Sequence, residues 1–130
     1  MPKKDALREV GIVENVRVIG GNEIKAMALC DSGASSTSVD VKLAAKALLG
    51  PIVGTVKIRN PSHKQEVRRP VAKARIIIAG REFETDVNVQ DRSHMTFPVL
   101  IGRNILSGNF VINTKKNHDV FDRKRAKRGD

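Results

Sequence analysis

Short stretches in which polar and apolar residues alternate recur along the chain, and turn-forming residues separate them. Residues 24–31 and 82–89 both place apolar or small side chains at every second position, the period of a half-buried β-strand. Residues 20–22 (Gly-Gly-Asn) form a hairpin turn before the first stretch, and Gly80 breaks the chain before the second. Five or more such strands separated by turns predict a closed or sandwich-like all-β domain.

Helical spacing is limited to one or two short segments. Asp40 can cap a helix that Gly50-Pro51 stops. A second turn of helix is expected around Ile105 and Leu106. The apolar stripe predicted for the first helix consists of Val41, Ala44, Ala45 and Leu48.

Two further extended regions lie in the second half of the chain. Residues 56–58 and about 65–78 are predicted strands of a hairpin whose tip is residues 60–63 (Asn-Pro-Ser-His). Residues 97–101 form a continuous apolar run, which is typical of a strand covered on both sides, and Gly102 ends it.

The 130 residues suffice for one domain, since two would leave each underpacked. We expect an N-terminal arm at residues 1–7, the domain at residues 8–114 and a basic tail at residues 115–130. The tail holds seven Lys or Arg and three Asp, within a formal net charge of +10. It is either a frayed, solvated end or a contact for an acidic partner such as nucleic acid or a ribosome.

Several function classes find no support in the residues. No apolar run approaches a membrane span or a signal peptide, so we expect a cytoplasmic protein without membrane contact. Cys30 is expected to be a small core residue, and the three histidines are too scattered for a metal site. A glycine-rich phosphate loop is also missing, so no cofactor is expected.

Asp31-Ser32-Gly33-Ala34 leaves an apolar strand and enters a turn, which places a carboxylate where the backbone can approach a substrate closely. Alone, this tetrapeptide is also compatible with a turn that performs no chemistry. A second segment, residues 97–106 (Phe-Pro-Val-Leu-Ile-Gly-Arg-Asn-Ile-Leu), supplies an apolar strand broken at glycine before a short helix. The pair together favours an active site at Asp31.

These two segments resemble the retropepsin-like aspartic peptidases, in which an Asp-Thr/Ser-Gly-Ala loop packs against an apolar-Gly-Arg-Asn/Asp segment. Residues 34–38 and 91–98 are also similar to a prokaryotic family labelled ATP-dependent zinc proteases. The resemblance implies a retropepsin-like closed β-barrel, the single-lobe acid-protease fold, with one or two short helices. Members of the prokaryotic family are linked to a ligase that adds glutamates to a ribosomal protein, which implies an acidic peptide substrate.

The resemblance also implies roles for individual residues. Since the chain holds one Asp-Ser-Gly motif and the chemistry needs two carboxylates, an active enzyme is expected to be a homodimer whose paired Asp31 carboxylates activate water. Arg68 and Arg69, near the hairpin, either contact an acidic substrate or form a solvated basic face. The expected catalytic residues are Asp31, Ser32 and Gly33, the expected substrate-binding residues are Ala34, Ser35, Arg68 and Arg69, and the expected structural supports are Gly102, Arg103 and Asn104.

Two departures from the retroviral pattern are visible. Ser35 stands where many retroviral members have Asp, so the sequence does not identify the partner of Arg103. The hairpin tip carries Pro61 and His63, whereas retroviral flaps are rich in glycine. The alternative of a different class is a non-catalytic dimeric binding module that uses the same scaffold to hold a ribosomal or nucleic-acid partner.

Overall fold

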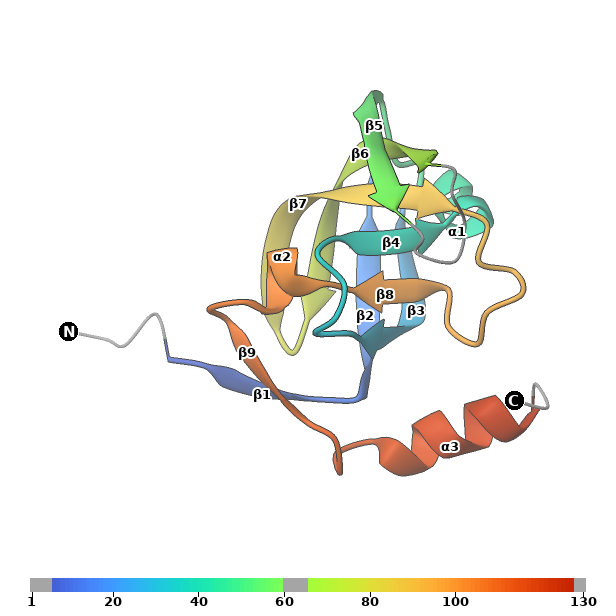
Figure 1. Cartoon of the computed structure of the whole chain (residues 1–130). Coiled ribbons are helices and arrows are strands. Elements are labelled where there is room, and N and C mark those ends of the chain that lie inside the picture. Colours follow the sequence, from blue (N-terminus) through green and yellow to red (C-terminus); the bar gives the residue numbers. More distant parts are fainter. Residues whose placement is uncertain (1–5, 60–65, 128–130) are drawn as a thin grey trace.

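The structure is a computed structural model that describes residues 6–59 and 66–127. That part of the chain is mostly β, with three short helices (Figure 1). In chain order its elements are β1 (Arg8–Gly11), β2 (Val13–Ile19), β3 (Glu23–Cys30), β4 (Thr37–Asp40), α1 (Val41–Lys46), β5 (Ile52–Arg59), β6 (Glu66–Ile78), β7 (Arg81–Gln90), β8 (Val99–Ile101), α2 (Arg103–Leu106), β9 (Phe110–Asn113) and α3 (His118–Lys127).

Six strands close into a barrel, in the order β2-β3-β8-β4-β7-β6. Closure comes from β2, which pairs antiparallel with β3 through Val16↔Ala26 and with β6 through Val16↔Ile78. Closure removes the free edges of a sheet, so of the seven strands in this sheet only β5 lies outside the ring, where it pairs with β6. The closed β-barrel predicted from the sequence is confirmed.

The barrel interior is filled by the inward-facing side chains of the alternating strands. Val18, Ile76 and Ile78 are fully buried, and Val87 and Ile101 meet them from other strands of the ring. Full burial of each such side chain stabilises the fold by about 1.5–3 kcal/mol. Cys30, which precedes Asp31, is buried in the same core, as predicted.

Helix α1 forms where predicted, and the Asp40 side chain accepts a hydrogen bond from the backbone N–H of Lys42. The predicted apolar stripe is wrong except at Ala44, since Val41 is 48 % and Leu48 is 59 % exposed. Leu43, Ala44 and Ala47 are buried instead. The helix ends at Lys46 and Leu48 has a φ of 54°, so Leu48 leaves the line that regular helical spacing would give it.

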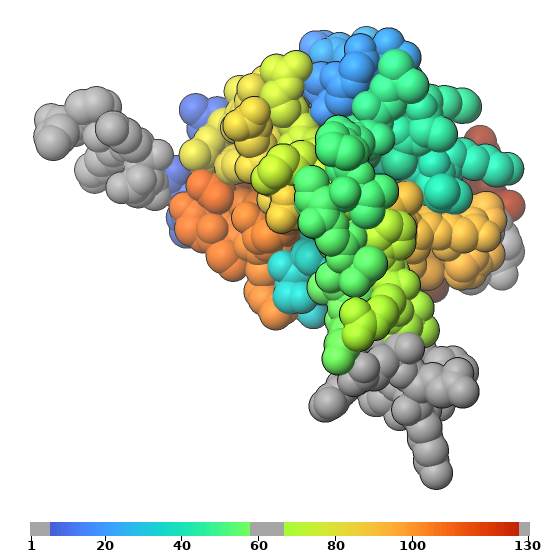
Figure 2. All heavy atoms as spheres, turned by 90° about the horizontal axis from the view of Figure 1, so that it is seen from above, coloured from blue at the N-terminus to red at the C-terminus, as the bar shows by residue number. Residues whose placement is uncertain are grey.

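The hairpin of β5 and β6 covers the top of the molecule, and Figure 2 shows β5 (green) crossing that face. Its pairing runs from Ile52↔Ala72 to Arg59↔Glu66. The predicted tip at residues 60–63 lies outside the described residues.

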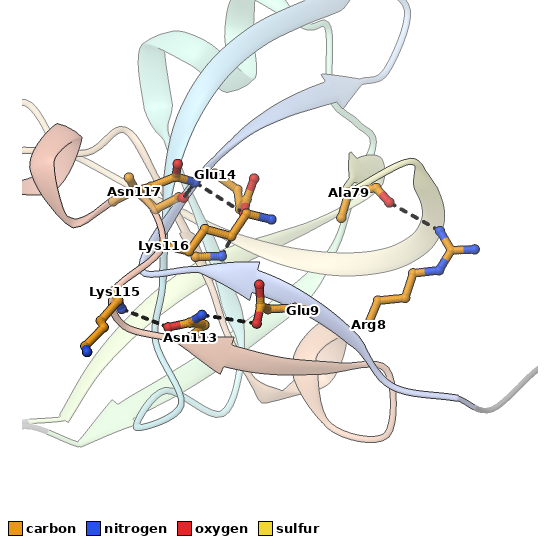
Figure 3. Close-up of polar contacts among 10 residues, drawn as sticks. Arg8, Glu9, Glu14, Ala79, Asn113, Lys115, Lys116 and Asn117 are labelled. Atoms are coloured by element: carbon orange, nitrogen blue, oxygen red, sulfur yellow. Dashed lines mark hydrogen bonds and ion pairs between the residues drawn. The ribbon is translucent and has the colours of Figure 1, made fainter.

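β1 and β9 pair in parallel outside the barrel and lead into α3 (Figure 1). Figure 3 shows the polar contacts that fix this region. Asn113 Nδ2 donates to Glu9 Oε1 at 3.1 Å, and Asn117 Nδ2 donates to the Val13 carbonyl at 2.8 Å. Residues 118–127 of the basic tail are therefore a helix anchored to the barrel, not a frayed end. None of the described helices is both long and apolar enough to cross a membrane.

Candidate active site

Asp31 stands directly after β3, with its backbone and its carboxylate both held in place. The backbone N–H of Asp31 donates to the Ile101 carbonyl at 2.9 Å, which joins the loop to β8. The N–H of Gly33 donates to Asp31 Oδ1 at 2.8 Å. A Cβ at Gly33 would lie 3.1 Å from that oxygen, so glycine here leaves room for the carboxylate.

Helix α2 holds the loop of residues 31–36, the catalytic loop below, from the other side. The backbone N–H groups of Arg103 and Asn104 donate to the carbonyls of Ala34 and Ser35 at 2.8 and 3.2 Å. The side chain of Arg103 also donates from Nη1 to the Ser32 carbonyl at 3.0 Å. Ser32 is thus the partner of Arg103 that the sequence left open.

Gly102 is where the backbones of the catalytic loop and α2 come closest. A Cβ on Gly102 would overlap the Ser36 carbonyl oxygen and lie 2.6 Å from its carbon. Any side chain would therefore push the two segments apart. The backbone N–H of Gly102 donates to Thr37 Oγ1 at 3.2 Å, and this hydrogen bond also ties Gly102 to β4.

A buried polar network continues this support beneath the catalytic loop. Thr37 Oγ1 donates to Asn104 Oδ1 at 2.8 Å. Asn88 Nδ2 donates to Ser36 Oγ at 3.0 Å and to the Thr37 carbonyl at 3.1 Å. Ser38 Oγ donates to Asn88 Oδ1 at 2.7 Å. The sequence did not single out Thr37 or Asn88. No strand was predicted at Thr37, and Asn88 falls on the polar face of the alternating segment 82–89.

A cavity of about 440 Å³ opens beside the catalytic loop, and the hairpin of β5 and β6 lines its other side. Gly33, Ala34 and Ser35 line it from the loop, and Lys57 and Arg69 line it from β5 and β6. Arg68 does not line this cavity, and its Nη1 lies 3.5 Å from Thr55 Oγ1 on the hairpin. The structure therefore brings Arg69, but not Arg68, to the other predicted substrate-binding residues.

Arg92 also lines the cavity, and it is only 5 % exposed. Its Nε donates to the Phe97 carbonyl at 2.9 Å, and its backbone N–H donates to Asp40 Oδ1 at 2.8 Å. Burial lowers the pKa of the Arg92 guanidinium, as does the nearby Arg69 charge, while Asp40 and Asp31 act in the opposite direction. Burial likewise lowers the pKa of Arg69. The sequence did not assign Arg92 to the site, because an arginine flanked by polar residues resembles a surface loop.

Other reactive groups near the site contribute little chemistry. Burial, and to a smaller extent the charge of Glu14, raises the pKa of the Cys30 thiol to about 12, so the thiol stays protonated. Within residues 6–59 and 66–127, no group of three or more His, Cys, Asp or Glu is placed to hold a metal ion. His63, one of the scattered histidines, lies outside those residues.

A family model described as "RimB-like: Retropepsin-like aspartic endopeptidase RimB" matches residues 34–120. The matched segment contains α2 and all the residues that line the cavity except Gly33, and it begins directly after Asp31, Ser32 and Gly33. No curated protein gives a significant match.

Solved structures with this fold include viral and bacterial proteins. The EIAV protease in complex with the inhibitor HBY-793 has a TM-score of 0.60 and 19 % identity, over 78 % of this chain and 91 % of that one. The Legionella pneumophila protein Lpg0085 (DUF785), of unknown function, has a TM-score of 0.59 and 19 % identity, over 85 % and 95 %. The simian foamy virus protease has a TM-score of 0.52 and 20 % identity, over 71 % and 88 %. These identities are low, so the likeness establishes a fold shared with retroviral proteases.

Proposed function

The chain belongs to the RimB-like family of retropepsin-like aspartic endopeptidases, and we propose that it hydrolyses peptide bonds as a homodimer with one Asp31 from each copy at the reacting centre. The observation that carries this proposal is the fixed Asp31 carboxylate, held by Gly33 beside a cavity that the catalytic loop and the hairpin share.

In the proposed reaction, two Asp31 carboxylates share one proton. One ionised carboxylate takes a proton from water, whose oxygen attacks the peptide carbonyl carbon, while the other carboxyl donates a proton to the carbonyl oxygen. The first carboxyl then gives its proton to the amide nitrogen as the carbon–nitrogen bond breaks, and the second carboxylate takes a proton from one hydroxyl of the tetrahedral intermediate. These steps leave a carboxylic acid and an amine, and they restore the singly protonated pair. Like charges at one site are costly, so the singly protonated pair is the active form and the rate passes through a maximum with pH.

The face beneath the catalytic loop offers a surface for the second copy. Among the described strands, β1 and β9 pair only with each other, so each keeps an unpaired edge. Leu7 and Val111 beside these edges are 52 % and 48 % exposed. A cavity of about 340 Å³ connects Ser32 and Arg103 with Phe110 and Ile112 of β9. A copy docked here reaches both the terminal strands and the catalytic loop.

The charge around the larger cavity supports an acidic peptide as the substrate. Arg69 and Arg92 line it, and neither forms an ion pair within the described parts of the chain. Arg69 is partly buried, and burying a guanidinium without a carboxylate partner is costly, so a substrate carboxylate in the cavity relieves that cost. Of the two interpretations offered for Arg69, contact with an acidic substrate is therefore favoured over a solvated basic face.

The test incubates wild-type protein and Asp31→Asn with a peptide library. Asn keeps the size of Asp and its hydrogen-bonding oxygen but cannot ionise, so we expect cleavage only by the wild type, with matching circular dichroism spectra. A folded Asp31→Asn protein that cleaves at the wild-type rate contradicts the proposal and favours a binding module.

The preference for acidic peptides is tested separately, with pairs of peptides that are identical except for Glu or Gln at one position. In Arg69→Gln we expect the preference in kcat/KM for the Glu peptide to fall about tenfold, the scale of one charge-assisted hydrogen bond. Arg68→Gln is the matched control, because Arg68 does not line the cavity. An equal effect of both substitutions points to general electrostatic attraction instead.

A further inference from the structure

Helix α3 is held against the barrel at two places. At its start, Asn117 bonds to Val13, and Lys116 Nζ lies 3.6 Å from Glu14 Oε2 (Figure 3). Near its middle, the Phe121 ring stacks on the Phe97 ring, with centroids 5.9 Å apart and an interplanar angle of 11°. Phe97 is 3 % exposed and lies in the segment before β8. The helix is therefore a fixed part of the surface that it covers.

Between α3 and the barrel lies a hollow of about 280 Å³. Leu29, Met95 and Leu100 line it from the barrel side, and Phe121 and Arg125 line it from α3. A water molecule in the liquid occupies about 30 Å³, so the hollow is far larger than a single water site. Its lining is apolar apart from two arginines and Thr96, which suits an apolar side chain.

This hollow adjoins the active-site cavity. Arg92, Met95 and Leu100 line both spaces. Leu29 lies two residues before Asp31, and the register pairs it with Leu100 on β8, which is paired in turn with Ser38 on β4. Since directly paired residues share one face of a sheet, the hollow and the cavity are neighbours on the same face. A peptide that extends from Asp31 along this face reaches the hollow.

We propose that α3 forms one wall of a substrate subsite, in which Phe121 and the barrel residues Leu29 and Leu100 enclose a large apolar side chain of the bound peptide. This inference rests on the proposed function, because it places the peptide at the catalytic loop. Arg125 lies over the Phe121 ring, 5.3 Å from its centroid, and keeps a positive charge at the rim. From the sequence, residues 115–130 were predicted to be a separate tail. In the proposed subsite, Phe121 and Arg125 of this segment contribute to peptide selection.

The test uses the full chain with Asp31→Asn, which binds peptides without cleaving them, and a displayed random peptide library as the probe. We expect enriched peptides to share Leu, Met or Phe at one position. Adding Phe121→Ala should reduce that enrichment about tenfold, since it removes one wall. Phe121→Leu keeps an apolar contact with Phe97 and should retain an apolar preference with altered size selection. Lys124→Ala is the matched control on the same helix, because Lys124 does not line the hollow.

The subsite is overturned if Phe121→Ala and Lys124→Ala leave the same enrichment, if no apolar position is enriched, or if no peptide is captured. Hydrolysis by the wild-type chain is measured separately. Enrichment that depends on Phe121 without any cleavage removes the proposed peptidase but supports the subsite. Normal cleavage with enrichment unchanged by Phe121→Ala removes the subsite and leaves the peptidase in place.

Discussion

The catalytic loop and the hairpin of β5 and β6 lie on two sides of the same cavity but are held in different ways. The loop is fixed by backbone hydrogen bonds from Arg103 and Asn104 and by the close approach of Gly102. On the hairpin, Val53 and Val67 are exposed, and the side-chain contact from Arg68 to Thr55 is long at 3.5 Å. In the proposed enzyme, the loop provides fixed geometry for the chemistry, and the hairpin presents the side chains that select a substrate.

The largest expected contrast concerns thiol reactivity. Because burial raises the pKa of Cys30 from 9.0 to about 12, its thiolate fraction at pH 8 is about a thousandth of that of an exposed thiol. We expect alkylation of native protein at pH 8 to be slower by at least about that factor than alkylation in urea. A Cys30→Ala, Val53→Cys variant, with its thiol on the exposed hairpin, should react at the rate of a free thiol. Rapid alkylation of Cys30 in the native protein would mean that the end of β3 opens readily, which contradicts a fixed catalytic loop directly after it.

A pair of glycine substitutions compares the two regions in stability. Gly102→Ala forces a Cβ onto the Ser36 backbone, and we expect the free energy of unfolding to fall by about 3 kcal/mol. Gly54→Ala on β5 meets no atom within 4 Å and should change it by less than about 0.5 kcal/mol. Urea denaturation measures both. Equal effects would mean that the loop is no more constrained than the hairpin.

Removing the buried amide of Asn88, which lies beneath the catalytic loop, should lower the unfolding free energy by less than Gly102→Ala does. Asn88→Ala leaves the Ser38 hydroxyl and the Thr37 carbonyl without their partner, so we expect a loss of about 2 kcal/mol in unfolding free energy. Arg68→Ala, which removes only the long, exposed contact to Thr55, should cost less than about 0.5 kcal/mol. Thermal denaturation of the two variants distinguishes these values, and a neutral Asn88→Ala contradicts the role of the network.

The barrel could be predicted from sequence because its strands carry their own periodicity and turns. The catalytic loop and the Gly102 segment were also identifiable, since both carry a short motif. Strand β4 was not predicted, because Thr37, Ser38 and Asp40 resemble a loop until partners distant in sequence bury them.

Contacts across the fold decided the remaining features. The buried face of α1 depends on what packs against a helix of six residues, so spacing alone indicated the wrong stripe. Arg92 enters the site because Asp40 and Phe97 hold it there. The docking of α3 depends on Phe97 and Val13, which lie in distant parts of the chain. None of these pairings leaves a local signal in the sequence.

The most direct test of the central claim, that two copies each contribute one Asp31, is a mixing experiment. Wild-type protein is equilibrated with an equal amount of Asp31→Asn, and peptide hydrolysis is measured per wild-type chain. Random pairing leaves about a quarter of the dimers with two Asp31 residues, so activity per wild-type chain should fall to about half, and further as the variant is added in excess. Activity per wild-type chain that stays constant at every ratio contradicts the shared site, provided that a tag on one of the two chains co-purifies the other and so shows mixed dimers.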